Sequence, residues 1–381
     1  MTTFLVLLLV FLQFGACSAY KSLLGGGFES SFFDINIDRS HPEKLYKEFE
    51  DFIVKYKRTY KDEIEKKFRF NLFVNTHNTI NQLSKKASAA GSGVKYGINK
   101  FADLTSEEYR IRFSKVAPGN HSTVPIFNLN DPKIKSNRTK RQLDNFPTSY
   151  DLRNVKVGGR YVMGPVKDQG HCGCCWAFAA TAVAESALAV HQKKFISLSD
   201  QEVCDCGAKT MPGCAGGDPM LGLQYLEESG VTAEEEYEYE DGRSNYTDCD
   251  AAKHDRELNQ FELSSYRIDP FNAEYQILQH LNILKLPVAA AFRVGKDFRV
   301  YESGVIPQEG CNAEEHVSWH SAAIVGYGVD LEPNGKAQDF WVVKNSWGAS
   351  GWGNEGGFVR VPRGTNWCDI ESHVTGARIP E

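Results

Sequence analysis

Apolar and polar residues alternate with a helical period through the first part of the chain. Between residues 42 and 86, Lys, Arg and Glu are interspersed with apolar residues at helical spacing, among them Phe49, Phe73 and Ile80. Residues 177–192 are rich in alanine and contain neither Gly nor Pro, which predicts a buried helix. The pattern therefore predicts a charged amphipathic helical segment and, well after it, a helix enclosed by the rest of the protein.

Strand-like runs gather in the last third of the chain. They are short and apolar, and they indicate a β-rich lobe that begins near residue 265. The stretch 116–145 is polar, contains Pro and Gly, and predicts an exposed linker. The strand-like runs span residues 262–268, 288–294, 322–329, 340–344 and 358–361.

Composition and the N-terminal residues narrow the class of protein. A chain of 381 residues with 24% charged residues is typical of a soluble protein of two domains, or of one domain with a removable segment. Its net charge of −6 gives no reason to expect nucleic acid or an anionic membrane as a partner. The apolar run 4–14 is too short to span a bilayer, so residues 1–19 are interpreted as a secretory signal peptide rather than a buried helix. Glycosylation sequons at Asn120, Asn137 and Asn245 are consistent with that route.

A candidate nucleophile stands where the buried helix begins. The sequence QGHCGCCWAF, residues 169–178, places Cys175 at the N-terminal end of the predicted helix. Unpaired N–H groups and the partial positive charge of a helix N-terminus favour a thiolate over a thiol. The Gly-containing turn before the helix can bring the carboxamide of Gln169 beside the sulfur. That carboxamide and the backbone N–H of Cys175 would then be the two donors of an oxyanion hole.

A candidate base and its orienting group lie in the β-rich part. His320 heads one apolar, strand-like run, and Asn345 ends the next. A His–Asn pair at adjacent strand ends can fix the imidazole tautomer, while Trp347 can screen the hydrogen bond between them from water. A neutral amide orients the ring without disturbing the balance between thiolate and imidazolium.

The cysteines allow a second interpretation. Cysteine and histidine are the usual ligands of structural zinc. The spacings here are Cys-x-Cys-Cys and Cys-x-Cys rather than Cys-x-x-Cys, so we expect no metal and no cofactor. Nine of the ten cysteines lie at or after Cys172, and one reactive thiol plus disulfides would account for that odd number in an oxidising compartment.

Together, in this order, the motifs resemble the papain family of cysteine proteases, of the cathepsin type. His320 follows Cys175 at the interval typical of that family, and Asn345 lies somewhat beyond it. The resemblance covers the chain from about residue 50 onward. It implies an α+β, papain-like two-lobed fold, in which an α-helical lobe carries Cys175 and a β-barrel-like lobe carries the other two residues. It also implies a cysteine endopeptidase that works through an acyl-enzyme intermediate.

The resemblance extends to an inhibitory segment. Glu65, Arg69, Phe73 and Ile80 match the family's prosegment helix signature, and residues 97–103 match its second prosegment motif. The match implies an inhibitory propeptide rather than a small charged helical domain. Because carboxylate contacts weaken when they are protonated, we expect activation at acidic pH, with Asp103 as one acid-sensitive contact. The implied boundaries are 1–19 for the signal peptide, 20–141 for the propeptide, cut near the dibasic stretch 138–141, and 142–381 for the mature protease domain.

Disulfides and a substrate pocket are implied as well. The family pairs Cys172 with Cys214, Cys206 with Cys249, and Cys311 with Cys368. Cys174 and Cys204 depart from the family pattern, and we hypothesise a fourth disulfide between them, the alternative being two buried thiols. The residues implied for substrate binding are Gly216, Gly217, Pro219, Met220, Ala291, Ser318, Trp347 and His373.

Within that pocket, bare backbone at the two glycines lets an extended substrate bind like an added strand. A protonated His373 would favour acidic or polar substrate side chains, and a His373 turned to solvent is the alternative.

Other functions remain open at this point. An exopeptidase is less favoured, because residues 215–248 contain no His and no additional Cys such as a dipeptide-removing relative carries in its extra loop. A non-catalytic binding protein would normally lack the nucleophile or the base, and an acyl-transfer enzyme would share the same machinery. The expected partners are polypeptide substrates, the chain's own propeptide and cystatin-like inhibitors. We expect a monomer without a membrane span in the secretory pathway, bound for a lysosome or vacuole or for secretion.

Overall fold

The computed structural model describes residues 42–128, 146–207, 213–243, 249, 262–311 and 318–380. The expected signal peptide, the sequons at Asn137 and Asn245 and the dibasic stretch lie outside the described residues. Within them, no helix is both long and apolar enough to cross a membrane.

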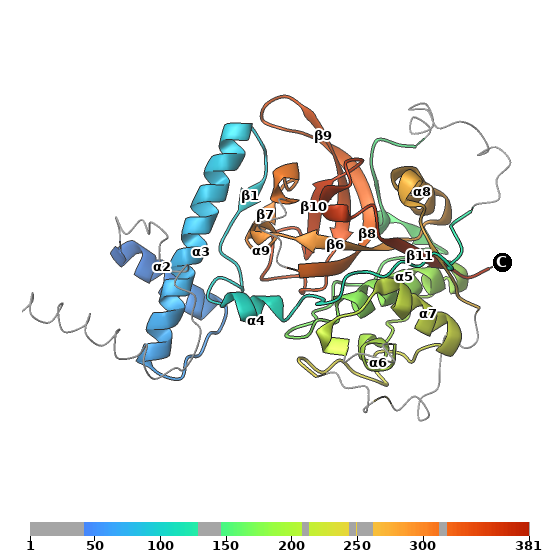
Figure 1. Ribbon diagram of the computed structural model, residues 1–381, viewed down its shortest axis with the longest axis horizontal. Coiled ribbons are helices and arrows are strands. Elements are labelled where there is room, and N and C mark those ends of the chain that lie inside the picture. Colours follow the sequence, from blue (N-terminus) through green and yellow to red (C-terminus); the bar gives the residue numbers. More distant parts are fainter. Residues whose placement is uncertain are drawn as a thin grey trace, which may run out of the picture. The chain divides into compact units, whose positions relative to one another are not determined.

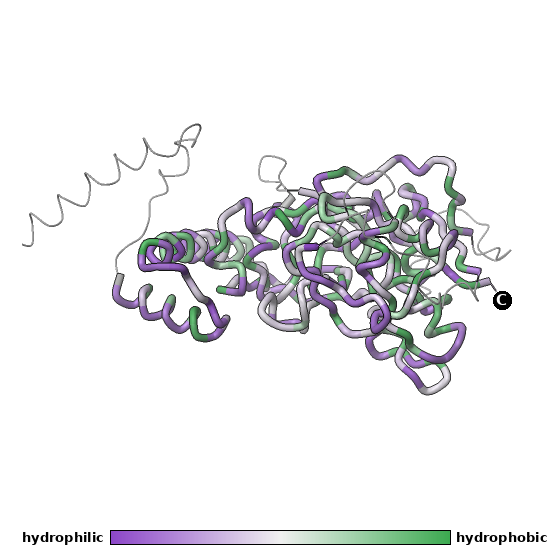
Figure 2. The backbone as a smooth tube through the Cα atoms, turned by 90° about the horizontal axis from the view of Figure 1, so that it is seen from below, coloured by the Kyte–Doolittle hydropathy of each residue, from purple (hydrophilic) through white to green (hydrophobic). Residues whose placement is uncertain are grey.

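The first described segment forms two helices, α2 (Pro42–Lys55) and α3 (Glu63–Ala90), along which hydrophilic and hydrophobic residues alternate (Figure 2). Phe49 and Phe73 are buried between them, with ring centroids 5.4 Å apart. Gly91 ends α3 at a φ of 65°, a conformation that residues with a side chain rarely adopt. The amphipathic helical prediction for this part of the chain is confirmed.

Beyond α3 the chain forms β1 (Lys95–Tyr96) and α4 (Ser106–Arg110). Thr105 and Glu108 cap α4 reciprocally, since each side chain accepts the backbone N–H of the other residue. The same carboxylate binds the guanidinium of Arg69, on α3, through two hydrogen bonds of 2.6 and 2.7 Å. These bonds lower the pKa of Glu108 to about 2. The ion pair stabilises the fold at any pH above the ordinary pKa of a glutamate, and this contribution is lost only as the pH falls through about 2.

In the part of the chain that the structure describes, three α-helices form the helical lobe, namely α5 (Cys175–Gln192), α6 (Asp200–Cys206) and α7 (Pro219–Ser229) (Figure 1). All of α5 as far as Ala189 is buried, because its many alanines let α7 and the neighbouring sheet approach closely. The predicted buried helix is confirmed, and it begins two residues earlier than expected, at Cys175.

A seven-stranded antiparallel sheet forms the other lobe, in the order β10-β9-β8-β6-β11-β5, with β2 paired to β8. Each of the five predicted runs overlaps a strand. The strands are β2 (Tyr150–Asp151), β5 (Ser264–Arg267), β6 (Val288–Val294), β8 (Ser318–Leu331), β9 (Ala337–Lys344), β10 (Phe358–Pro362) and β11 (Val374–Arg378). The shorter elements are β3 (Lys156–Val157), β4 (Arg160–Tyr161), β7 (Tyr301–Ser303), α8 (Ala273–Gln279) and α9 (Lys296–Arg299).

Candidate active site

Cys175 is the first residue of α5 and is fully buried. The residue before it, Cys174, makes no side-chain cap, so no side chain at the N-cap position competes for the N–H groups of the first turn. Burial raises the pKa of the thiol to about 11, although hydrogen bonds from Ser321 and Ser114 oppose this rise. Cys175 is also the one free cysteine among the described residues.

His320 and Asn345 meet as the sequence predicted, from neighbouring strands. His320 lies near the start of β8, Asn345 directly follows β9, and the two strands pair. The imidazole Nε2 and the amide Oδ1 are 2.8 Å apart, and the ring of Trp347 lies 5.1 Å from the imidazole. Burial lowers the pKa of His320 to about 4, while the bond to Asn345 opposes this effect. Nδ1 of His320 has no hydrogen-bond partner among the described residues, so this nitrogen is available for proton transfer.

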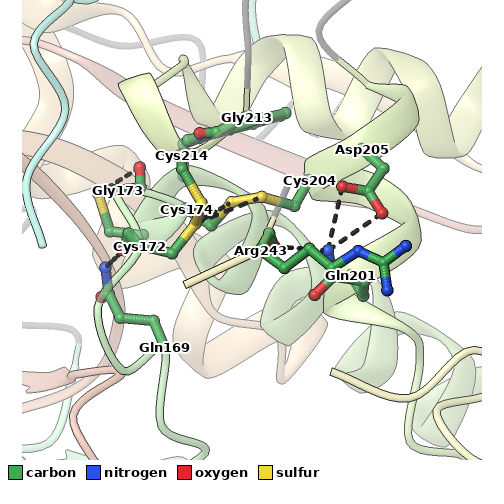
Figure 3. Close-up of a disulfide and its surroundings, with 12 residues drawn as sticks. Gln169, Cys172, Gly173, Cys174, Gln201, Cys204, Asp205, Gly213, Cys214 and Arg243 are labelled. Carbon is green, nitrogen blue, oxygen red and sulfur yellow. Dashed lines mark hydrogen bonds between the residues drawn. A yellow bond between two sulfur atoms is a disulfide. The ribbon is translucent and has the colours of Figure 1, made fainter. Parts of the chain in front are cut away.

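Gln169 is fully buried and fixed from both sides of its carboxamide. Its Oε1 accepts the hydroxyl of Ser346 at 2.5 Å, and its Nε2 donates to the carbonyl of Cys172 at 2.7 Å (Figure 3). Nε2 also donates to the carbonyl of Arg112 at 2.8 Å, and Arg112 belongs to the expected propeptide. The backbone carbonyl of Arg112 therefore accepts a hydrogen bond from the carboxamide of Gln169, which we predicted from the sequence to be an oxyanion-hole donor.

The expected propeptide continues past the thiol as an added strand. The N–H of Ser114 donates to the carbonyl of Trp319 at 2.9 Å, and the N–H of Lys115 donates to that of Ala215 at 3.1 Å. The Ser114 hydroxyl bonds to the carbonyl of Gly217 at 3.3 Å. A Cβ on Gly216, whose φ is 114°, would lie 2.6 Å from Cα of Ser114. The bare backbone expected at this glycine pair is therefore needed for the close approach of the strand.

Aromatic side chains anchor the propeptide beside the same centre. Phe101, Tyr109 and Phe113 are buried, and their ring centroids lie 5.2, 5.8 and 5.7 Å from that of Trp347. Phe113 also contacts the imidazole of His320, at 5.4 Å between centroids. The expected propeptide thus covers His320, the candidate base, and contacts Trp347, one of the expected substrate-binding residues.

The pKa shifts of Cys175 and His320 both favour the uncharged form of the side chain. With the thiol shifted to about 11 and the imidazole to about 4, both groups are neutral at pH 7 under the propeptide. Both shifts are caused mainly by burial, which disfavours the charged form of each group. Readmitting water should therefore allow the thiolate and the imidazolium to form.

The structure places the remaining expected pocket residues on α7, on β6, at the start of β8 and just before β11. Pro219 and Met220 are buried in the first turn of α7. Ala291 lies on β6, and its N–H donates to the carbonyl of His373 at 2.9 Å. Ser318 begins β8. The ring of His373 is half-buried and packs nearly at right angles to that of Trp319, with 5.3 Å between the centroids. Burial lowers its pKa, so protonation of His373 requires a lower pH than usual.

Disulfides join the active-site turn to the helices that follow it (Figure 3). Cys172 is bonded to Cys214, and Cys206 to Cys249. The structure also bonds Cys174 to Cys204, as hypothesised. The sulfurs of Cys172, Cys174 and Cys214 lie close enough together for a metal, but as disulfides they are not the thiolates that zinc binds. Cys368 is disulfide-bonded, and the side chain of its implied partner, Cys311, lies outside the described part of the chain.

Sequence reasoning missed the polar residues that hold this centre together. Ser346 fixes Gln169, and Ser321 bonds to the thiol of Cys175. Ser321 directly follows His320, and Ser346 directly follows Asn345. Their position next to a predicted catalytic residue was the only sign in the sequence that they could be part of the site.

Comparisons with known proteins agree with this geometry. The family model for papain family cysteine protease matches residues 146–378, and that for the cathepsin propeptide inhibitor domain matches residues 49–109. Papain of Carica papaya is 30% identical over 353 residues, covering 91% of this chain and 89% of papain. Ananain of Ananas comosus is 31% identical, covering 84% and 83%. Among solved structures, digestive procathepsin L 3 of Tenebrio molitor matches with a TM-score of 0.67 at 26% identity, covering 88% and 99%. A recombinant stem bromelain precursor matches with a TM-score of 0.66 at 28% identity, covering 89% and 100%.

Proposed function

The chain belongs to the papain family of cysteine proteases, and on that premise we propose how its residues divide the catalytic work. It is a cysteine endopeptidase made as a zymogen, with its own propeptide as intramolecular inhibitor and proteins as substrates. The proposal assigns the nucleophile to Cys175, the general base and acid to His320, the orienting amide to Asn345 and the oxyanion donor to Gln169. The observation that carries it is the propeptide carbonyl of Arg112 bound to the carboxamide of Gln169, where a substrate oxyanion would lie.

The reaction follows from these roles. The thiolate of Cys175 attacks the scissile carbonyl carbon, and the carbonyl oxygen becomes an oxyanion held by the carboxamide of Gln169 and the N–H of Cys175. As the C–N bond breaks, the imidazolium of His320 gives its proton to the leaving amine. The thioester that remains is attacked by water, which gives a proton back to the imidazole. Breaking of the C–S bond releases the acid and restores the thiolate.

Alkylation kinetics test this assignment. In the proenzyme, a thiol with a pKa of about 11 is ionised at pH 7 in roughly one molecule in 10⁴. In the mature enzyme the thiolate should be stabilised by the imidazolium, so we expect an irreversible epoxide inhibitor to label Cys175 at least ~10³-fold faster. Labelling of the proenzyme should accelerate as the pH rises toward 11. Peptide mapping locates the label, and inactivation with the label on any other residue would contradict the assignment.

Acid activation is the second part of the proposal, and we assign it to contacts other than that of Asp103. Asp103 was expected to be an acid-sensitive contact of the docked propeptide. Its carboxylate binds Arg58 and the hydroxyl of Tyr60, each at 2.9 Å, and both partners belong to the propeptide itself. Two of the carboxylates of the protease domain that bind the propeptide are Asp168, 2.6 Å from the ammonium of Lys100, and Glu332, which accepts the N–H of Gly93. Protonation of these two would weaken docking while the propeptide keeps its internal fold.

Asp103→Asn tests the internal contact. The Asp103 side chain is only 3% exposed, and a hydrogen bond to a charged group contributes about 1.5–3 kcal/mol. We therefore expect the variant proenzyme to convert to the mature form about tenfold faster at pH 7, as followed by gel electrophoresis. Asp51→Asn, an exposed position on α2, is the matched control and should convert at the wild-type rate. An unchanged rate for Asp103→Asn would contradict the prediction.

The destination and partners complete the proposal. We place the enzyme in the secretory pathway, either lysosomal or vacuolar or secreted, and its disulfides support an oxidising compartment. We propose that it acts as a monomer and that cystatin-like inhibitors bind the cleft that the propeptide occupies in the zymogen.

A further inference from the structure

Asp218 directly follows the glycine pair, and its two carboxylate oxygens have different partners. Oδ1 accepts the N–H of Met220 at 2.9 Å and caps α7. Oδ2 accepts the N–H of Gly119 and contacts Nε2 of His121, and it lies 2.7 Å from each of these two nitrogens. One oxygen therefore serves the fold of the protease domain, and the other binds the propeptide.

The contact with His121 is sheltered from solvent. The side chain of Asp218 is 6% exposed and that of His121 is 18% exposed. The hydrogen bond to Asp218 raises the pKa of His121, which favours the imidazolium form. The propeptide thus places the imidazole of His121 on the carboxylate of Asp218. His121 lies seven residues beyond Ser114, the propeptide residue that bonds to the thiol of Cys175.

Removal of the propeptide changes the partners of only one of the two carboxylate oxygens of Asp218. Both partners of Oδ2 leave with the propeptide, whereas the N–H of Met220 stays with α7. The other ionisable groups that act on the pair are His373, whose pKa burial lowers, and Arg267, which opposes protonation of His121. A carboxylate oxygen without a partner then faces the cleft beside the pocket residues Pro219 and Met220.

We propose that Asp218 is a specificity-determining residue, which selects substrates with a basic side chain (Arg, Lys or protonated His) at the second or third position before the scissile bond. The basic group of the substrate takes the place that His121 holds in the zymogen and donates to Oδ2. This rests on the proposed function, because it concerns the substrate of the same cleft. A sheltered hydrogen bond between two charged groups is among the stronger ones in proteins, so it can set a preference of roughly ten- to a hundredfold.

The test compares mature wild type with Asp218→Asn on fluorogenic peptides varied at those two positions. Asparagine caps a helix as well as aspartate does, so the variant keeps the Met220 bond and loses only the charge. We expect wild type to cleave Arg or Lys peptides about tenfold or more faster, by kcat/KM, than the matched norleucine and Gln peptides. Asp218→Asn should abolish this preference while cleaving the norleucine peptides within about threefold of wild type.

Each result has a separate meaning. A wild type that hydrolyses peptides without a basic preference, or an Asp218→Asn variant that keeps the preference, would overturn the role of Asp218 and leave the protease assignment standing. A mature wild type that hydrolyses none of the peptides would contradict the proposed function and this role together. Asp218→Ala, which also loses the cap, should resemble Asp218→Asn in preference and be less stable to heat.

Discussion

A Cys175→Ala proenzyme is expected to accumulate uncleaved, and its matured form should hydrolyse peptides roughly 10⁴-fold more slowly than wild type, or slower still. Alanine supplies no atom that can form the acyl-enzyme, so the base and the oxyanion donors act on an attacking water alone. The measurement is kcat/KM on a fluorogenic peptide, after the variant has been matured by a trace of wild-type enzyme. That cleavage in trans also shows that the variant reaches a native, processable form.

The neighbouring cysteines provide the matched control. Cys174→Ala/Cys204→Ala removes two buried sulfurs, one of them adjacent to Cys175, and leaves the nucleophile in place. Loss of this disulfide should lower stability by about 2–5 kcal/mol, so activity is measured well below the melting temperature. We expect hydrolysis to continue in the control and to be lost in Cys175→Ala. Persistent turnover by Cys175→Ala would refute the assigned nucleophile.

The proposed catalytic positions could be picked out from the sequence because each lies within a local pattern, and the meeting of His320 with Asn345 could be foreseen in the same way. Cys175 follows from a helix signal, and His320 and Asn345 follow from strand ends that the register of β8 and β9 brings together. The missed strand β11 (Val374–Arg378) shows the limit of such patterns. Its sequence VTGAR has little apolar character of its own, and it becomes a strand by pairing with β5 and β6 on either side.

Contacts between distant segments could not be predicted in this way. Asp103 binds Arg58, and Asp218 binds His121, across intervals that no period or motif spans. A carboxylate is usually solvated, and nothing in its own neighbourhood in the sequence tells which cation the fold will place against it. The same limit applied to Arg112, whose backbone carbonyl, rather than its side chain, reaches Gln169.

A buried ionic cluster in the helical lobe leads to the largest expected effect on stability. The ammonium of Lys167 lies 2.7 Å from Asp200, 2.9 Å from Glu185 and 3.3 Å from Glu234. Asp200 and Glu185 are almost completely buried. Burial raises the pKa of Asp200 and its acidic neighbours raise it further, while Lys167 opposes the shift. Lys167 is therefore a cation that opposes the protonation of Asp200 inside the protein.

Lys167→Met should lower the free energy of unfolding by about 3–5 kcal/mol at pH 7, because buried carboxylates lose the charge that compensates them. Since burial already raises the pKa of Asp200 in the folded state, acidification protonates it there before it does so in the unfolded chain. The folded variant thus regains stability as the pH falls, and the difference from wild type should narrow toward pH 4. Urea unfolding in a Cys175→Ala background, which prevents self-digestion, measures both quantities. Lys194→Met, at an exposed position, should change stability by no more than about 0.5 kcal/mol, and an equally small loss for Lys167→Met would show that the cluster does not stabilise the fold.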